Sequence, residues 1–486
     1  MIKNLFTAVL LLAFCFSQAQ FTSPNTGEVL SLDDIANMSP STITVDGNEY
    51  TLLEDILIME NDALVLDENL TLKIEEDIEI EIEGGFTSDA DEIIITAVDP
   101  DKPFGGFIFR NTSSIYFKNT TITYGGGLRV LTYDFEMYDC EVSYQSAGVS
   151  TGGAISFSNS SPIIMNSVFK FNERAALASG ANTSAAATIE GNYFEGNNQS
   201  NANAPQINMG PSGAGNLTKV INNVVIGDRD LTRVGGISVS SLLGVENNVL
   251  ISGNEVRDNR FGIAVLGNSS GTISDNIIED NDTEGDPMLG GSGINLFNTN
   301  MVQVHGNEIR RNLWGVTLQG TAQANFGSNN PDDENPGMNI FSENGNGGEI
   351  YAIYNNTPND IMALHNCWIE GQEVTIDDVE GVIFHNPDDS TLGEVSYDPY
   401  IECGLMNTVD LEKNKFEIYP NPAKHSFNVN STTAATLNVY DLNGRLIQTY
   451  KVNSGTNNFS TEMKKGVYIL EFITEHSKSI ERLIVQ

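Results

Sequence analysis

The segment Gly253-Asn254-Glu255-Val256-Arg257-Asp258-Asn259 and its near copy Gly306-Asn307-Glu308-Ile309-Arg310-Arg311-Asn312 decide how this chain folds. In both, a first Asn is followed two positions later by an apolar residue and five positions later by a second Asn. Ten copies of the pattern can be found, some of them with a substitute for Asn, and successive copies begin 20 to 32 residues apart. Their first positions are Thr120, Cys140, Ser167, Asn192, Asn223, Asn254, Asn276, Asn307, Asn339 and Asn366. A short motif that recurs at this spacing indicates a solenoid.

Within each copy the pattern predicts short strands. The residue two positions after the first one is apolar every time, and a second alternating segment follows in several coils, as in Gly262-Ile263-Ala264-Val265. Such segments, separated by Gly and Asn, favour strands over helices. We expect the recurrent Asn to adopt a left-handed bend and to hydrogen-bond from coil to coil. In the copy that begins at Asn223, Asp228 stands in for the second Asn.

These copies resemble the right-handed parallel β-helix repeats of secreted bacterial proteins. The closing segment, His365-Asn366-Cys367-Trp368, is similar to the end of such solenoids. The resemblance covers residues 49–404 and implies an all-β fold, but it says little about activity because this fold hosts lyases, hydrolases, esterases and adhesins. We expect residues 20–48 to form a cap, since an uncovered solenoid end exposes a strand edge.

Composition narrows the class of protein. The chain has 24 Lys and Arg against 65 Asp and Glu, a formal net charge of −41. Such a chain repels phosphate backbones and anionic lipids, so we expect no nucleic-acid or membrane-surface partner, whereas Ca²⁺ would be attracted. Residues 1–19 have the features of a signal peptide, with Lys3, an apolar stretch and small residues at Ser17 and Ala19. No later apolar run is long enough for a membrane span.

Three cysteines follow the predicted signal peptide. Cys367 and Cys403 both lie near the end of the repeats and could pair in an exported protein, while the odd count leaves at least one thiol free. No Cys/His spacing typical of a zinc site occurs.

The sequence changes character after Cys403. Nine of the 24 basic residues fall in residues 411–486, and short alternating segments joined by Asn/Gly turns predict a small immunoglobulin-like sandwich over residues 416–486, after a linker at 405–415. This segment resembles the type A C-terminal sorting domain of type IX secretion cargo, found in Bacteroidetes. The residues that carry the resemblance are Tyr419, Pro420, Asn421, Pro422, Asn443, Gly444, Gly466, Tyr468 and Arg482, the last where Lys is more usual. It implies handling by the type IX secretion machinery and export across both membranes, followed by release or attachment at the cell surface.

A candidate site lies among three inserted loops, residues 198–206, 229–235 and 282–291. They follow the second Asn position of their coils and would emerge from one edge, while the coil between the last two loops has no insertion. We expect a groove there with Arg260 on its floor, where it is a catalytic candidate. The predicted walls contain the catalytic candidates Arg229 and Arg233 and the binding candidates Asp230, Asp282, Glu284 and Asp286, the last three also forming a candidate Ca²⁺ site. Trp314 and Tyr351 are candidate sugar-stacking platforms.

Two functions fit these residues. The first is a non-catalytic surface protein that binds a glycan or another cell through the solenoid. The alternative is a polysaccharide-degrading enzyme, a lyase or less plausibly a glycoside hydrolase, in which Ca²⁺ neutralises a uronate and an Arg acts as base. We favour the first, because no specific catalytic motif occurs and Lys is scarce in the coils.

Overall fold

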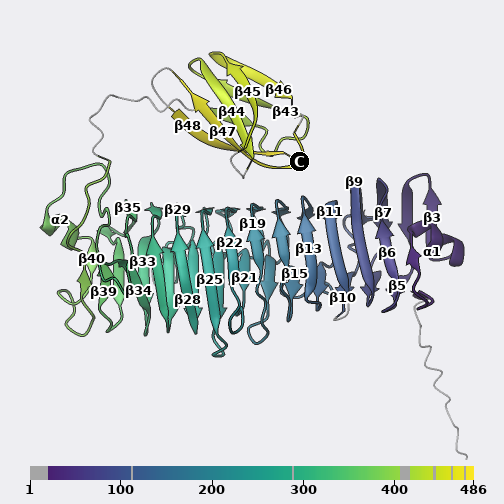
Figure 1. Cartoon of the computed structure of the whole chain (residues 1–486), viewed down its shortest axis with the longest axis horizontal. Coiled ribbons are helices and arrows are strands. Elements are labelled where there is room, and N and C mark those ends of the chain that lie inside the picture. The colour runs from purple at the N-terminus through teal and green to yellow at the C-terminus, as the bar shows by residue number, and fades with distance from the viewer. Residues whose placement is uncertain are drawn as a thin grey trace, which may run out of the picture.

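The computed structural model describes residues 20–110, 113–286, 289–404, 416–441, 445–460, 463–474 and 478–485. The predicted signal peptide (1–19), the predicted linker (405–415) and the turn residues Asn443 and Gly444 lie outside them. The described residues form a long parallel β-solenoid and a small antiparallel domain beside it (Figure 1). Neither helix among these residues is long and apolar enough to cross a membrane.

Each coil of the solenoid contributes strands to three faces. Face 1 is a 14-stranded parallel sheet. Its strands are β1 (Gln20–Thr22), β5 (Asp55–Ile58), β8 (Glu79–Ile82), β10 (Gly106–Phe109), β12 (Leu128–Val130), β15 (Gly153–Phe157), β18 (Ala175–Ser179), β21 (Ile207–Met209), β24 (Ile237–Ser241), β27 (Ile263–Gly267), β30 (Ser292–Asn298), β33 (Trp314–Gln319), β38 (Ile353–Asn356) and β40 (Ile383–Phe384).

Face 2 adjoins face 3, and the long strands β9 (Gly85–Ala97) and β11 (Ser114–Thr123) run through both. The other strands of face 2 are β2 (Val29–Leu30), β6 (Ala63–Leu66), β13 (Asp134–Tyr138), β16 (Ile163–Met165), β19 (Thr188–Glu190), β22 (Thr218–Ile221), β25 (Asn247–Ser252), β28 (Ser269–Ser274), β31 (Met301–His305), β34 (Gln323–Gly327), β39 (Ile361–Ala363) and β41 (Val395–Ser396).

Face 3 carries the predicted repeats. Its other strands are β3 (Ile43–Asp46), β4 (Glu49–Leu52), β7 (Leu70–Ile74), β14 (Glu141–Ser143), β17 (Val168–Lys170), β20 (Tyr193–Glu195), β23 (Val224–Ile226), β26 (Glu255–Arg257), β29 (Ile277–Glu279), β32 (Glu308–Arg310) and β35 (Ile340–Ser342). All of these pairs are parallel except β3 with β4. A small hairpin, β36 (Gly345–Asn346) and β37 (Glu349–Ile350), projects after face 3.

The apolar residue of each repeat points into the solenoid, as the pattern predicts. Phe169, Phe194, Val225 and Val256 are fully buried and belong to one continuous core that runs along the coils. The stacking of identical positions lets each coil shield its neighbour's apolar face, which a single coil could not do.

The first Asn of the repeat forms a ladder, but it does not make the left-handed bend. The positive φ belongs to the residue just before it, for example Asn222, Gly253 and Asp275. The ladder Asn is instead buried, and Asn254 Oδ1 accepts hydrogen bonds from the backbone N and Nδ2 of Asn223, at 2.9 and 3.0 Å. The side chain of the ladder Asn therefore hydrogen-bonds to the backbone of the neighbouring coil. The left-handed bend is made by the residue before it.

The second Asn position forms a second ladder alongside the first. The prediction for one of its members, Asp228, is wrong. Asp228 does not take the place of Asn in its coil. The side chain of Gln206, from the preceding loop, reaches in and joins Asn197 to Asn259, at 2.9 and 3.0 Å. A longer side chain entering from a loop thus keeps the buried ladder continuous.

Both solenoid ends are covered. The parallel pairing begins before the boundary expected at residue 49, because β1 and β2 already pair with β5 and β6. Helix α1 (Leu32–Met38) then places the buried Leu32 and Ile35 over the end of the core. At the other end lies α2 (Ile376–Glu380), and Cys367 and Cys403 form a disulfide there, whereas Cys140 is free and buried.

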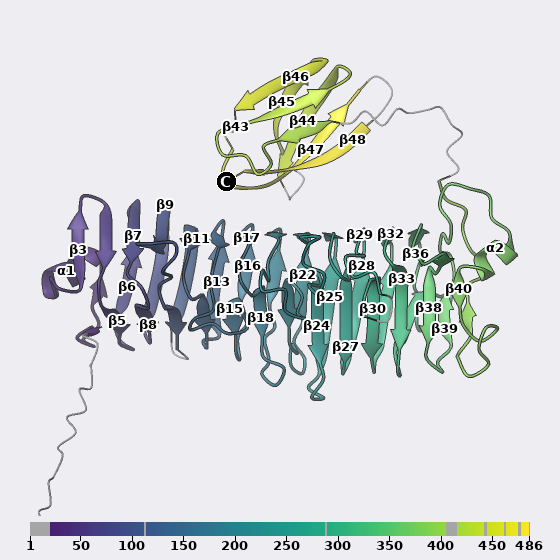
Figure 2. The same ribbon diagram turned by 180° about the vertical axis from the view of Figure 1, so that it is seen from behind.

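The C-terminal domain is an antiparallel sandwich with its own core. One sheet contains β42 (Glu417–Tyr419), β43 (Ser426–Ser431) and β46 (Gly455–Ser460), and the other contains β45 (Leu446–Val452), β44 (Ala435–Asp441), β47 (Gly466–Ile473) and β48 (Lys478–Val485). Phe427, Leu437, Leu470 and Phe472 are fully buried between them. Figure 2 shows this domain alongside the middle of the solenoid.

Candidate functional site

The loop edge brings Arg229 and Asp282 into direct contact. The Nη2 atom of Arg229 lies 2.6 Å from Asp282 Oδ1, and its Nη1 lies 3.0 Å from Asp258 Oδ1 in the coil between them. The hydrogen bonds that Arg229 donates to the carboxylates of Asp282 and Asp258 raise the pKa of Arg229 above its ordinary value. Arg229 therefore bridges the two walls that the sequence placed on opposite sides of a gap.

Arg260 lies in the coil without an insertion, but it lines the wall of a groove on face 1 instead of the floor of a groove between the loops. Its Nη1 donates to Asn203 Oδ1, and no carboxylate forms an ion pair with it in the described parts of the chain. Gly290 packs directly on it, since a Cβ there would lie 2.5 Å from Arg260 Nε. Burial lowers the pKa of Arg260, and the charge of Arg233 lowers it further against the opposing effect of Glu284.

The remaining predicted residues do not form a compact cluster. The backbone N of Arg233 donates to Asn201 Oδ1, that of Asp230 to Asp228 Oδ1, and that of Asp286 to Glu284 Oε1. Among the residues that the structure describes, no three His, Cys, Asp or Glu side chains are arranged to hold a metal ion. The Ca²⁺ site at Asp282, Glu284 and Asp286 therefore stays a prediction without support from the geometry.

A groove with a volume of about 280 Å³ lies on the outer surface of face 1, over β24, β27, β30 and β33. The outward residues Ser238, Ala264, Asn295 and Thr317 are in register across these strands and form its floor. They are all small, and the larger side chains beside them form the walls. The wall residues are Arg260, Phe261, Leu266, Leu289, Trp314 and Gln319. The depression thus results from a row of small residues between larger ones.

An aromatic ladder continues the groove towards the C-terminal coils. The rings of Trp314 and Tyr354 stack with centroids 4.6 Å apart and planes 8° apart, and Tyr354 stacks on Phe384 at 4.5 Å and 5°. Tyr351 meets Trp314 edge-on at 5.7 Å. All four are half-buried, so part of each ring stays exposed. Flat, partly exposed rings are the surfaces on which apolar faces of other molecules pack.

Two members of this ladder were missed in the sequence. Tyr354 and Phe384 occupy the same register position as Thr317 on adjacent strands of face 1. Aligning Ala352-Ile353-Tyr354 and Val382-Ile383-Phe384 with Gly315-Val316-Thr317 would have found them. The signal is weak because the connecting segments differ in length, which hides the shared register.

Comparison with known proteins supports both parts of the architecture. Residues 181–373 match the family described as the right handed beta helix region, and residues 417–486 match the secretion system C-terminal sorting domain. Solved structures of the periplasmic alginate epimerase AlgG and of one of its mutants are similar at 14% and 13% identity. Their TM-scores are 0.34 and 0.39, with 77% of this chain covered in each case and 81% and 82% of the other chain. No curated protein matches the chain.

The chain is therefore an exported right-handed β-helix protein. Its C-terminal sandwich is a secretion system sorting domain, which confirms the resemblance seen in the sequence. Tyr419 ends its first strand, β42, and Pro420, Asn421 and Pro422 follow it. The Oδ1 atom of Asn421 accepts a hydrogen bond from the backbone N of Ile484, at 2.8 Å. This bond joins the opening motif to the closing strand β48.

Proposed function

We propose that the solenoid binds a glycan in the groove on face 1. The observation that carries the proposal is the juxtaposition of the stacked ring of Trp314 with polar side chains of Asn295 and Gln319 in one open groove. A sugar ring presents an apolar face and a rim of hydroxyl groups, so an aromatic surface beside amide groups matches both. The row of outward positions allows several sugar units to lie across successive strands.

Arg260 gives the groove a place for an acidic group. It borders the groove and has no ion-pair partner in the described residues, although the chain carries 65 Asp and Glu. A carboxylate or sulfate on the glycan would supply the charge-assisted hydrogen bonds that Arg260 lacks. We therefore favour an acidic polysaccharide over a neutral one.

The lyase alternative draws on Arg229, which does lie beside carboxylates. However, its ion pairs hold the proton on the guanidinium, whereas a base has to accept one. Catalysis is for this reason the second candidate and is tested in the same experiment.

Export places this groove outside the cell. We infer that a signal peptide in residues 1–19 takes the chain into the periplasm and that the type IX machinery carries it across the outer membrane, to be released or attached at the surface. The sorting domain supports this route.

The test is to titrate the full chain with alginate, pectate, a sulfated glycan and a neutral glucan by calorimetry. Absorbance of unsaturated products and reducing ends is followed in parallel. We expect binding without turnover and a preference for the acidic glycans. Trp314→Ala should lose at least about fivefold in affinity, because packing of a sugar on an aromatic ring contributes on the order of 1 kcal/mol or more. Arg260→Gln should lose affinity only for acidic glycans.

Tyr133→Ala is the matched control, since Tyr133 is 68% exposed and does not line the groove. Equal losses in Trp314→Ala and Tyr133→Ala, or no binding by any glycan, would contradict the proposal. Unsaturated products would establish the lyase instead. Repeating the titration with Ca²⁺ and with a chelator tests the predicted Ca²⁺ site.

A further inference from the structure

Three strands of face 3 bury both of their sides. In β17, β20 and β23 the middle residue points into the solenoid core, so the first residue of each points outward. These outward residues, Val168, Tyr193 and Val224, are in register on neighbouring coils. Although they stand on the outside of the solenoid, they are only 7%, 7% and 5% exposed. Something outside the coils must therefore cover them.

The cover is the sorting domain. Val467 on β47 and Ile484 on β48 are paired neighbours and are 8% and 3% exposed. They form one apolar cluster with Val168, Tyr193 and Val224, separate from the solenoid core and from the core of the sandwich. Since Val467 and Ile484 are not part of the sandwich's own core cluster, this contact accounts for their burial.

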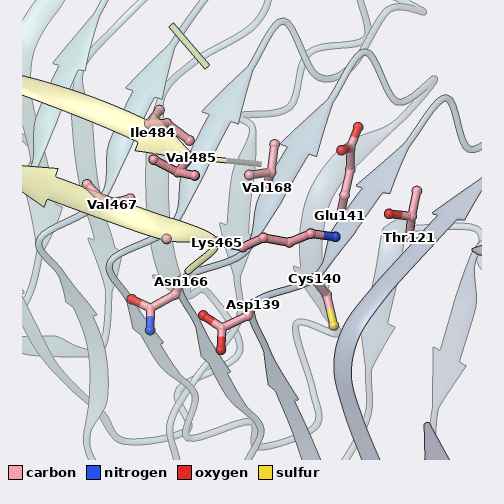
Figure 3. Close-up of a pocket in the computed structure, with 11 residues that line it drawn as sticks. Thr121, Asp139, Cys140, Glu141, Asn166, Val168, Lys465, Val467, Ile484 and Val485 are labelled. Carbon is pink, nitrogen blue, oxygen red and sulfur yellow. The ribbon is translucent and has the colours of Figure 1, made fainter. Parts of the chain in front are cut away.

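Charges on the two sides of the apolar cluster are complementary. The Nη1 atom of Arg482 in the sorting domain lies 3.4 Å from the Oε2 atom of Glu255 in the solenoid. On the other side, Lys465 lines a small cavity together with Asp139 and Glu141 of the solenoid, and Figure 3 shows its side chain extending from the domain towards Glu141. Basic groups of the domain thus meet acidic groups of the solenoid at both margins.

The charge distribution along the chain favours the same contact. Residues 416–486 contain seven Lys and Arg against six Asp and Glu, a net charge of +1, so the rest of the chain carries a net charge of −42. A weakly basic domain is attracted to a strongly acidic solenoid, and this attraction weakens with salt.

The connection between the two parts is long enough. The disulfide fixes Cys403 beside Cys367, which pairs with Ile340 at the end of face 3. Five coil steps separate that position from Val224, on the order of 24 Å at the usual strand spacing. The eleven residues 405–415 can reach roughly 36 Å when extended, so the domain can reach this surface on its own chain.

We propose that Val168, Tyr193 and Val224 form a docking surface for the chain's own sorting domain and that docking covers β47 and β48, which carry part of the sorting motif. Gly466 and Tyr468 flank Val467, and Arg482 lies two residues before Ile484. In the docked state these motif residues lie at the contact. The secretion machinery would have to displace the domain to bind β47 and β48 on this side.

The test uses the purified full chain as a monomer and a carbodiimide, which joins contacting amines and carboxylates by an amide bond. We expect a cross-linked peptide joining Lys465 to Asp139 or Glu141, identified by mass spectrometry. In a mixture of ¹⁴N- and ¹⁵N-labelled chains, the joined peptides should carry a single isotope, since docking occurs within one chain. Val224→Asp and Ile484→Asp should each lower its yield at least about tenfold, because each places a charge in an apolar contact.

Two matched controls separate docking from folding. Ile277→Asp changes the same outward position two coils beyond Val224, and Ile480→Asp changes the closing strand at a residue that is 61% exposed. Neither should lower the yield by more than about twofold, as both lie outside the cluster. Equal yields in Val224→Asp and Ile277→Asp, cross-links of mixed isotope only, or no cross-link in the unaltered monomer would each overturn the proposal.

Discussion

At the scale of single residues, the buried amides explain why the coils stay in register. Asn254 is 1% exposed, and each of its polar side-chain atoms has partners in neighbouring coils. Besides accepting from Asn223, it donates through Nδ2 to the carbonyl of Val220 at 2.8 Å and to Asn276 Oδ1 at 2.9 Å. A buried polar group costs free energy when it lacks a partner, so each ladder member depends on the next.

Replacing Asn254 with Ala should therefore lower the free energy of unfolding by about 3 kcal/mol, because it leaves the backbone N of Asn223 and the carbonyl of Val220 unpaired. Asn300→Ala, which removes one exposed hydrogen bond to Asn268, should cost less than about 0.5 kcal/mol. Denaturant unfolding monitored by circular dichroism measures both. Similar midpoints for the two variants would show that the ladder does not stabilise the fold.

How far the residues could be predicted from the sequence depends on spacing. The Asn pattern predicted the coils because its positions are fixed within each repeat. It did not reveal that Gln206 occupies the ladder position predicted for Asp228. Nor did it reveal that Tyr354 and Phe384 stack on Trp314 in succession. In these cases a loop of variable length separates residues that become neighbours, and sequence distance no longer reports spatial register.

At the scale of elements, the buried carboxylate of Asp62 binds the backbone of the first coil. Asp62 is 2% exposed and accepts hydrogen bonds from the backbone N atoms of Asn25, Thr26, Gly27 and Glu28, at 2.6 to 3.0 Å. Burial alone raises the pKa of Asp62, but the hydrogen bonds from Ser23 and these backbone N–H groups outweigh it and lower the pKa to about 2.

This lowered pKa makes the first coil sensitive to acid. Because the folded pKa lies below the ordinary value of 3.8, the charged carboxylate stabilises the coil fully above about pH 4, and the stabilisation is lost as the pH falls towards 2. At pH 7, Asp62→Asn should lower the free energy that protects the amides of residues 25–28 from hydrogen exchange by about 2 kcal/mol. The difference between this variant and the unaltered protein should shrink below about pH 4. Hydrogen exchange quenched from each pH measures it. Asp91→Asn, at an exposed carboxylate, is the control, and a pH-independent difference would contradict the assignment.

The last coils depend on the disulfide between Cys367 and Cys403, which closes a loop of 36 residues. Cross-links of this length commonly stabilise by about 2–4 kcal/mol. Cys403→Ser should therefore speed proteolytic cleavage within residues 371–403 and leave the earlier coils resistant. Reducing the unaltered protein should reproduce the effect, and a cleavage rate that is unchanged in both would show that packing alone holds this segment.

At the scale of the whole molecule, the solenoid separates the two proposed binding surfaces. The groove lies on face 1 and the docking surface on face 3, with the continuous apolar core between them. A packed β-solenoid changes shape little, and no residue is shared between the groove and the docking cluster. The sorting domain and a glycan should thus be able to bind at the same time.

This separation predicts that the two activities are independent. Val224→Asp, which should release the sorting domain, is expected to leave the affinity for the preferred glycan within about twofold, because coupling requires a state that both ligands bias. Conversely, Trp314→Ala should leave the yield of the Lys465 cross-link unchanged, as should a saturating glycan. Calorimetry of the Val224→Asp variant and cross-linking with and without glycan provide the two measurements. If instead Val224→Asp changed the affinity for the glycan, and the glycan changed the yield of the cross-link by the same free energy, the two sites would be coupled. The sorting domain would then regulate what the groove binds.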